Sequence, residues 1–178
     1  MSCRLTNNIQ HTCEYNAGGI KTIILIDIND FDSYRFKDDS LFDSCYVEAV
    51  KVSNSKSVVL DIVNESIFEE TEQNLLFTQT LNTFVRGLEA SKTSDLLLAK
   101  SNKYLVIFTT MQGRSFSFAS DGGATLNFTQ ATGQTGETEG YAIQITKQSI
   151  YPLFEFDINA PREYTYRLHD IYFEETFN

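Results

Sequence analysis

Short apolar or alternating runs, separated by glycine, asparagine and serine, dominate the pattern of this chain. The first run spans residues 19–29, with aliphatic side chains at Ile20, Ile23, Ile24, Leu25, Ile26 and Ile28. β-Branched side chains suit a pleated surface, and a short apolar run bounded by turn residues is typical of a buried strand. We therefore predict a largely buried strand over residues 19–29.

Residues 104–156 are expected to supply the largest part of the sheet. Residues 104–108 (YLVIF) predict a buried strand, and the glycine-centred segments at 112–114 and 121–123 predict turns or a bulge. Further strands are predicted at 115–119, where Phe116 and Phe118 share one face, at 125–130, and at 141–146 leading into Ile150, Pro152 and Phe154. Between the last two lies a loop rich in glycine and threonine, residues 131–140.

Residues 75–87 (LLFTQTLNTFVRG) alternate in polarity. One parity is mostly apolar, and it consists of Leu75, Phe77, Gln79, Leu81, Thr83 and Val85. Because side chains two apart share one face of a strand, we predict a strand with that face on the core. A helix is the alternative, with Leu75, Gln79, Asn82 and Arg86 on one side, but its threonine and valine positions disfavour it.

Two more alternating or apolar runs flank the turn-forming residues 53–55. Residues 46–52 alternate, and the second run contains Val58, Val59, Leu60, Ile62 and Val63. The simplest prediction is a hairpin over residues 45–63. Residues 66–73 are either an acidic connector or a further short strand.

Residues 89–101 (EASKTSDLLLAKS) predict the one helix. Ser91 or Ser94 would cap its start, Asp95 would lie in its first turn, and Lys100 would suit its C-terminal end. We expect Leu96, Leu97 and Ala99 to bury one helix face against the sheet.

These elements predict a mainly β fold, an antiparallel β-sandwich or barrel with one short flanking helix and extensions at both ends. The 14 Phe and 9 Tyr residues favour strands as well. We divide the 178 residues into an N-terminal arm (1–17), a β domain (18–160) and a C-terminal extension (161–178). The extension is aromatic and charged, and an exposed aromatic tail favours docking on the same chain or on a neighbour.

The formal net charge of −10 argues against a protein that reads DNA or RNA, because such binding needs lysine and arginine to displace counterions. Three cysteines form no complete disulfide framework and suit a reducing cytoplasm. The N-terminus lacks the apolar core of a signal peptide, and no apolar run is long enough to cross a membrane. We expect a soluble protein made in the cytosol.

Residues 29–44 contain five aspartates and predict a solvated acidic loop. A calcium loop is the alternative, but starting from Asp27 the sixth position is Asp32 instead of glycine and the twelfth is Asp38 instead of glutamate. His11 and Cys13 could begin a zinc site, yet the other candidates, Cys3, Cys45 and His169, are scattered. We predict no metal.

The remaining motifs favour no reaction. Cys45 has no local base, and the segment 113–117 (GRSFS) lacks the second glycine of a nucleophile elbow. No Gly-Lys-Ser or Gly-Lys-Thr phosphate loop is present, and Glu155, Asp157 and Glu163 are more simply solvated charges than a glycosidase pair. We expect neither an enzyme nor a cofactor.

The order of these motifs carries a family likeness. It runs from Gly18-Gly19-Ile20-Lys21 through the hairpin, Phe77-Thr-Gln-Thr-Leu81, Leu96-Leu97-Leu98-Ala99, Tyr104-Leu-Val-Ile-Phe108, the Gly113 turn and Asp121-Gly-Gly123 to Thr132-Gly133, Thr135-Gly136, Gly140-Tyr141 and Pro152. This layout, over residues 13–157, resembles tail-tube-like and neck-ring virion proteins of tailed phages that infect Bacteroidetes, including the crAss-like group.

The resemblance implies a structural virion subunit that self-assembles into rings, hexameric or dodecameric, around a DNA conduit. Its partners would be other copies and other phage tail or neck proteins, and an acidic lumen would let DNA pass without specific binding. Assembly would take place in the host cytoplasm. The expected subunit-interface residues are Thr132, Gly133, Thr135, Gly136, Glu137, Tyr164, Tyr166, Tyr172 and Phe173. A carbohydrate- or receptor-binding β-sandwich is the alternative function.

Overall fold

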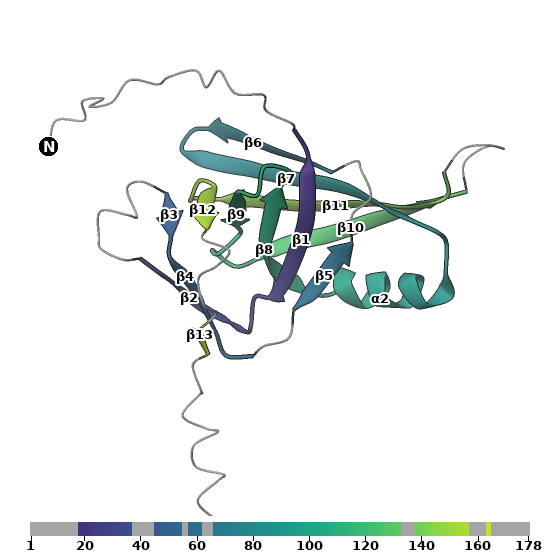
Figure 1. Cartoon of the computed structure of the whole chain (residues 1–178), viewed down its shortest axis with the longest axis horizontal. Helices are drawn as coiled ribbons and strands as arrows, with labels where there is room; N and C mark the ends of the chain where they lie inside the picture. The colour runs from purple at the N-terminus through teal and green to yellow at the C-terminus, as the bar shows by residue number, and fades with distance from the viewer. Residues whose placement is uncertain are drawn as a thin grey trace, which may run out of the picture.

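The computed structural model describes residues 18–36, 45–54, 57–61, 66–132, 138–156 and 163–164. Strands make up most of this part of the chain, and they form one ten-stranded and one three-stranded sheet (Figure 1). Most pairs are antiparallel, with two short parallel pairs. The predicted mainly β class, with a sandwich- or barrel-like arrangement and a flanking helix, is confirmed.

Four long strands form one layer in the order β10 (Ala124–Ala131), β11 (Gly140–Ser149), β7 (Leu76–Arg86) and β6 (Ile67–Gln73). The pair β7–β11 extends over ten residue positions, from Gly140↔Arg86 to Ser149↔Phe77. On β7 the apolar parity faces the core, where Leu81 is fully buried. The predicted strand at 75–87 is therefore confirmed, and the segment at 66–73 is a strand.

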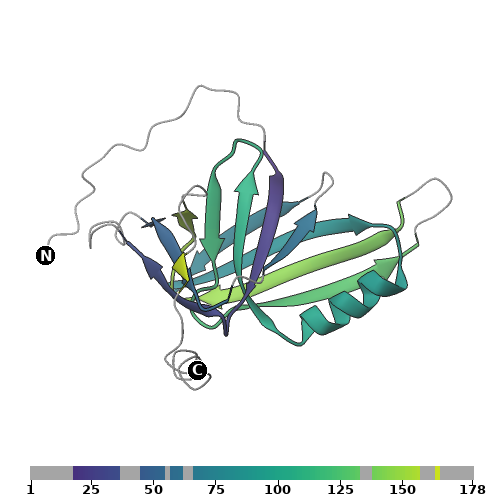
Figure 2. The same ribbon diagram turned by 60° about the horizontal axis from the view of Figure 1, so that its bottom comes forward.

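Strand β8 (Lys103–Thr110) lies at the centre of the fold. It pairs with β1 (Ile20–Asp27) and β9 (Ser115–Phe118) along its sides and with only two residues of β10, which makes a corner between the layers. Figure 2 shows β1, β8 and β9 crossing over the long strands. Both predicted buried strands, at 19–29 and 104–108, are confirmed.

Because successive side chains of β8 point to opposite faces, this strand contributes to two cores. Tyr104, Val106 and Phe108 belong to the core between the layers, together with Leu81, Leu126 and Ile145 from the long sheet. Leu105 and Ile107 belong to a second core on the other face. An apolar run covered on both faces explains why residues 104–108 show no alternation.

The second core is closed by the three-stranded sheet β13 (Glu163–Tyr164), β4 (Ala49–Val52) and β2 (Phe31–Arg35). β12 (Phe154–Phe156) and β3 (Tyr46–Val47), which extend the large sheet beyond β9, complete it. The prediction of a loop over 29–44 is wrong for residues 31–35. Phe31 and Tyr34 pack against this core, so burial of two aromatic rings outweighs the surrounding aspartates.

The predicted hairpin over 45–63 is also wrong. β4 pairs with β2, whereas β5 (Val58–Asp61) pairs with β1 in the other sheet. Val50 and Val52 pack in the second core, whereas Leu60 packs against the first, so the two runs cover different apolar surfaces. The backbone N–H of Ser53 donates to the carbonyl of Asp30 at 2.8 Å, which ties the end of β4 to the turn before β2.

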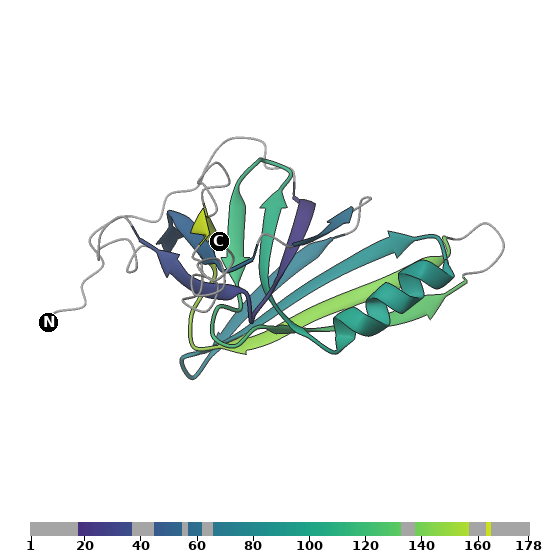
Figure 3. The same ribbon diagram turned by 90° about the horizontal axis from the view of Figure 1, so that it is seen from below.

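Helix α2 (Ala90–Lys100) confirms the predicted helix and packs against β10 (Figure 3). Its start differs from the expectation, because Glu89 is the N-cap residue, no side chain caps the helix, and Asp95 lies beyond the first turn. Instead, the Tyr141 hydroxyl accepts from the Glu89 N–H at 3.1 Å and donates to the Glu89 carbonyl at 2.9 Å. Leu96 is buried as expected, but Leu97 is not: more than half of its side chain is exposed.

Candidate subunit interface

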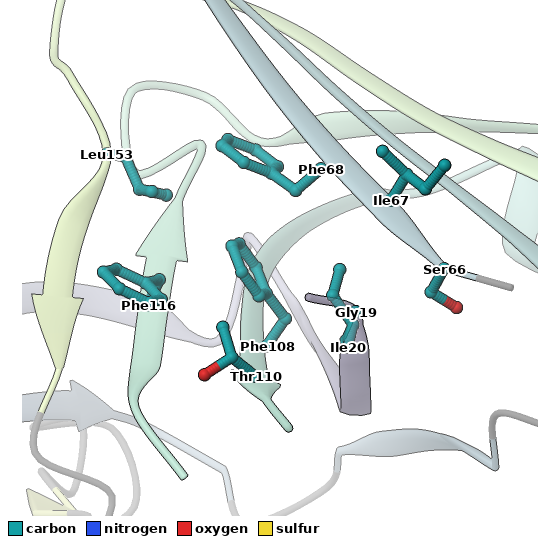
Figure 4. A pocket seen from close by; sticks show the side chains of 9 residues that line it. All are labelled: Gly19, Ile20, Ser66, Ile67, Phe68, Phe108, Thr110, Phe116 and Leu153. Atoms are coloured by element: carbon teal, nitrogen blue, oxygen red, sulfur yellow. The ribbon is translucent and has the colours of Figure 1, made fainter. Parts of the chain in front are cut away.

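An apolar groove opens where the start of β6 passes the ends of β1, β8 and β9. It encloses about 300 Å³ and is lined by Gly19, Ile20, Ser66, Ile67, Phe68, Phe108, Thr110, Phe116 and Leu153 (Figure 4). Its floor is a stack of rings, with Phe68 centred 4.9 Å from Phe108 and 5.2 Å from Phe118. The groove therefore offers apolar contact area.

Polar groups around this groove are paired within the protein. Ser66 Oγ lies 2.7 Å from Thr83 Oγ1, and the Leu153 N–H donates to the Glu70 carboxylate at 2.8 Å. On the rim, Arg114 donates twice to Glu155, at 2.8 and 3.1 Å, and its guanidinium lies over the Phe116 ring. The hydrogen bonds to Glu155, followed by its charge, raise the pKa of Arg114. No lining residue is an acid, a base or a cysteine, so this groove is suited to binding an apolar side chain and not to acid–base chemistry.

Large aliphatic side chains are exposed on two opposite sides of the long sheet. On one side, β6 is the outermost strand, and its hairpin with β7 exposes Ile67, Leu75 and Leu76. Leu75 is 82% exposed at the hairpin tip, where Asn74 and Leu75 both have positive φ. On the other side, α2 exposes Leu97 and Leu98, the latter at 67%. Exposed aliphatic groups gathered in this way mark surfaces that meet another molecule.

These two surfaces also differ in charge. We call Ile67, Glu69, Glu72, Leu75 and Leu76 the hairpin edge, and Leu97, Leu98, Lys100 and Lys103 the helix face. Residues 67–76 contain three glutamates and no lysine or arginine. Residues 86–103 contain four basic and two acidic residues within a chain of net charge −10. The helix face is therefore locally cationic and the hairpin edge anionic.

Strand β5 forms another open edge. In the part of the chain that the structure describes, it pairs only with β1, and Val58 and Val59 are each more than half exposed. Adjacent strand residues point to opposite faces, so β5 is accessible from both sides. Natural edge strands are usually protected by charges, proline or a bulge, and β6 carries such charges in Glu69, Glu70 and Glu72. Val58–Leu60 has none of these protections.

Little of the interface predicted from the sequence can be placed. Thr132 is exposed beyond the end of β10, and residues 133–137, which include Gly133, Thr135, Gly136 and Glu137, lie outside the described residues. Tyr164 belongs to β13, which pairs with β4, whereas Tyr166, Tyr172 and Phe173 lie outside them too. The sequence analysis missed both the helix face and the hairpin edge. Three consecutive leucines at 96–98 were the available signal, because a single helix face cannot bury all three.

The chemical alternatives gain no geometry. Within the described ranges, no group of three or more His, Cys, Asp and Glu side chains could hold a metal ion. Cys3, His11, Cys13 and His169 lie outside these ranges, and Cys45 is a half-buried free cysteine. In the acidic segment, Asp27 Oδ1 accepts 2.9 Å hydrogen bonds from the backbone and side-chain nitrogens of Asn29, so this carboxylate stabilises a turn.

A second, smaller hollow of about 220 Å³ lies over the second core and is lined by Phe31, Ser33, Tyr34, Phe36, Ser120, Tyr151 and Phe154. Its rings pack on one another, as in the Phe31–Tyr34 pair with centroids 5.2 Å apart. Burial raises the pKa of Tyr34 well above its ordinary value, an effect that outweighs the hydrogen bonds from Ser117 and Ser120. The phenol therefore stays neutral and serves as a packing and hydrogen-bonding group.

Among the described residues, no helix is long and apolar enough to span a membrane. No protein-family model, curated protein or solved structure matches the chain. The geometry of the chain itself is thus the basis for a functional proposal.

Proposed function

We propose that this protein is a structural virion subunit that assembles with copies of itself into a ring or tube of a phage tail or neck, around a DNA conduit. The observation that carries the proposal is the exposure of large aliphatic side chains on two opposite sides of one long sheet. A subunit with two separate sticky surfaces can bind a neighbour on each side, which is what a ring or tube requires.

The open edge of β5 supports the same function. A strand with unpaired backbone groups and exposed valines can extend its sheet by pairing with a strand of another chain. The order of motifs along residues 13–157, which resembles tail-tube-like and neck-ring proteins, adds the phage setting to this proposal.

The charge of the protein fits a conduit. DNA is attracted by lysine and arginine, and a wall with an excess of acids lets phosphates slide past without holding them. The outward parity of the long sheet is mainly polar, with Thr125, Asn127, Gln144 and Gln148 exposed. Such a wall would offer DNA neither cationic anchors nor apolar contacts.

The enzyme and glycan-binding alternatives receive less support. Glycan-binding β-sandwiches commonly present exposed aromatic rings to the sugar, and no described Phe or Tyr side chain is classed as exposed. The apolar groove and the smaller hollow are lined by packed rings and hydroxyls, without a convergent nucleophile and base.

Electron microscopy of the purified full-length protein at increasing concentration tests the proposal. We expect closed rings or short tubes of uniform diameter with a central opening. A strictly monomeric particle at high protein concentration would overturn it. A glycan array is the parallel measurement, and specific glycan binding without self-assembly would favour the alternative function instead.

A further inference from the structure

We infer that the helix face of one copy docks against the hairpin edge of the next copy, so that the subunits associate head to tail. This inference rests on the proposed self-assembly and adds to it the pair of surfaces that meet. The partner is a second copy of this chain, because each surface carries what the other one lacks.

The first argument is position. β6 is the outermost strand on one side of the long sheet, and α2 packs against β10 on the other (Figures 1 and 3). Two different surfaces on opposite sides of a subunit make a heterologous contact, which generates closed rings or open helical assemblies. Contacts between two identical surfaces would stop at a dimer.

The second argument is apolar content. Leu97 and Leu98 are more than half exposed on α2, where the neighbouring exposed positions are the small residues Ala90, Ser91 and Ser94. The hairpin edge exposes Ile67, Leu75 and Leu76. Large aliphatic side chains beside small ones allow close packing, and their burial between two copies is favourable by about 25 cal/mol per Å² of apolar area.

The third argument is charge. On the hairpin edge, Glu69 and Glu72 are exposed. On the helix face, Lys100 and Lys103 are exposed, and within the described residues neither forms an ion pair. By contrast, Lys92 is held locally by Glu89 at 2.9 Å. Opposite charges on the two surfaces attract in the head-to-tail arrangement, whereas two helix faces or two hairpin edges would repel.

The arrangement is anchored by the fold. Tyr141 is fully buried, and its hydroxyl lies 2.7 Å from Thr93 Oγ1 in addition to its two hydrogen bonds with Glu89. These bonds fix the first turns of α2 to β11, and Leu96 fixes its middle to the core. The helix face is therefore presented on a rigid support, which lowers the entropy lost on docking.

Charge reversal on each surface, followed by mixing, tests the inference. The two variants are Lys100→Glu and Glu69→Lys, with Lys21→Glu on β1 as a control of equal charge change. Each test variant alone places like charges across the contact, so we expect its self-association to weaken about tenfold or more in sedimentation velocity. An equimolar mixture restores opposite charges at alternate contacts, so assembly should return toward the wild-type level. Lys21→Glu should associate like the wild type.

The outcomes separate the inference from the proposed function. Wild-type rings together with unaffected variants, or a mixture that stays dissociated, would overturn the head-to-tail docking and leave the ring function standing. A wild-type protein that remains monomeric would overturn both. Thermal melting of all variants ensures that a loss of assembly is not a loss of folding.

Discussion

Tyr34 Oη lies 2.6 Å from Ser117 Oγ, although the two residues are 83 positions apart. Tyr34 belongs to β2 of the small sheet and Ser117 to β9 of the large one, so this hydrogen bond joins the two sheets across the second core. Ser117 is fully buried and burial keeps the Tyr34 phenol neutral, which makes this contact a sensitive probe of the packing between the sheets.

Tyr34 should make the protein sensitive to alkali. Its pKa is raised in the folded state, whereas in the unfolded chain a tyrosine titrates near ~10. Below that pH both states are protonated and the full stability is present; as the pH rises further, the unfolded state loses its proton first and unfolding becomes easier. The stability difference between wild type and Tyr34→Phe should therefore be constant below pH ~10 and shrink above it, as measured by urea unfolding across pH.

Ser117→Ala is the matched control for this prediction. It removes the hydrogen bond, at a cost of about 1 kcal/mol, but keeps the phenol, so its alkaline loss of stability should persist. A difference between wild type and Tyr34→Phe that does not change with pH would contradict the role given to burial.

Gly140 should tolerate no side chain. It starts β11, and a Cβ atom there would overlap the Val85 carbonyl oxygen and approach Phe84 Cζ to 2.9 Å. Gly140→Ala should lower the free energy of unfolding by about 1–3 kcal/mol through overpacking. Gly18→Ala is the control, because a Cβ atom at Gly18 meets nothing within 4 Å. Equal melting temperatures for the two variants would argue against the tight pairing of β11 with β7 at this end.

Adjacent leucines of α2 should separate folding from assembly. Leu96 is 8% exposed in the core, so Leu96→Ala should cost about 2–5 kcal/mol of folding stability. Leu97 is exposed, so Leu97→Ser should leave the melting temperature nearly unchanged and weaken self-association. Melting and sedimentation on both variants check this. A large loss of stability in Leu97→Ser would mean that this side chain belongs to the fold and not to the contact.

The sequence predicted elements far better than it predicted their partners. The buried runs that became β1 and β8 and the alternation that became β7 were recognisable because burial imposes a local pattern. The pairing of β5 with β1, instead of with β4, depends on which apolar surface each strand covers, and no local pattern records that. Likewise, the start of α2 is held by Tyr141, 52 residues from Glu89, so local capping residues misled the prediction.

The candidate interface shows the same limit. Thr132 and Tyr164 were chosen from a loop and a tail, whereas the helix face and the hairpin edge emerged only from exposure. Leu97 has the same residue type as the buried Leu96, and only the angle of one helical residue separates them. Acidic residues in β6 could be read as a connector until their position on an edge strand gave them a protective role.

The C-terminal extension gives another prediction. Deletion of residues 162–178 removes an aromatic segment that follows the long sheet in the chain and includes the Tyr164 position of β13. We expect the deletion to weaken assembly more than folding, as judged by sedimentation and by thermal melting of the same samples. Equal losses in both would make the extension part of the core.

The mass of the particle in solution tests the central claim most directly. Sedimentation equilibrium of the full-length protein, whose chain mass is 20.2 kDa, should show a concentration-dependent rise to one discrete multiple of that mass, as expected for a closed ring, or continued growth if the contacts form a tube. A constant mass of one chain across the whole concentration range would contradict the account.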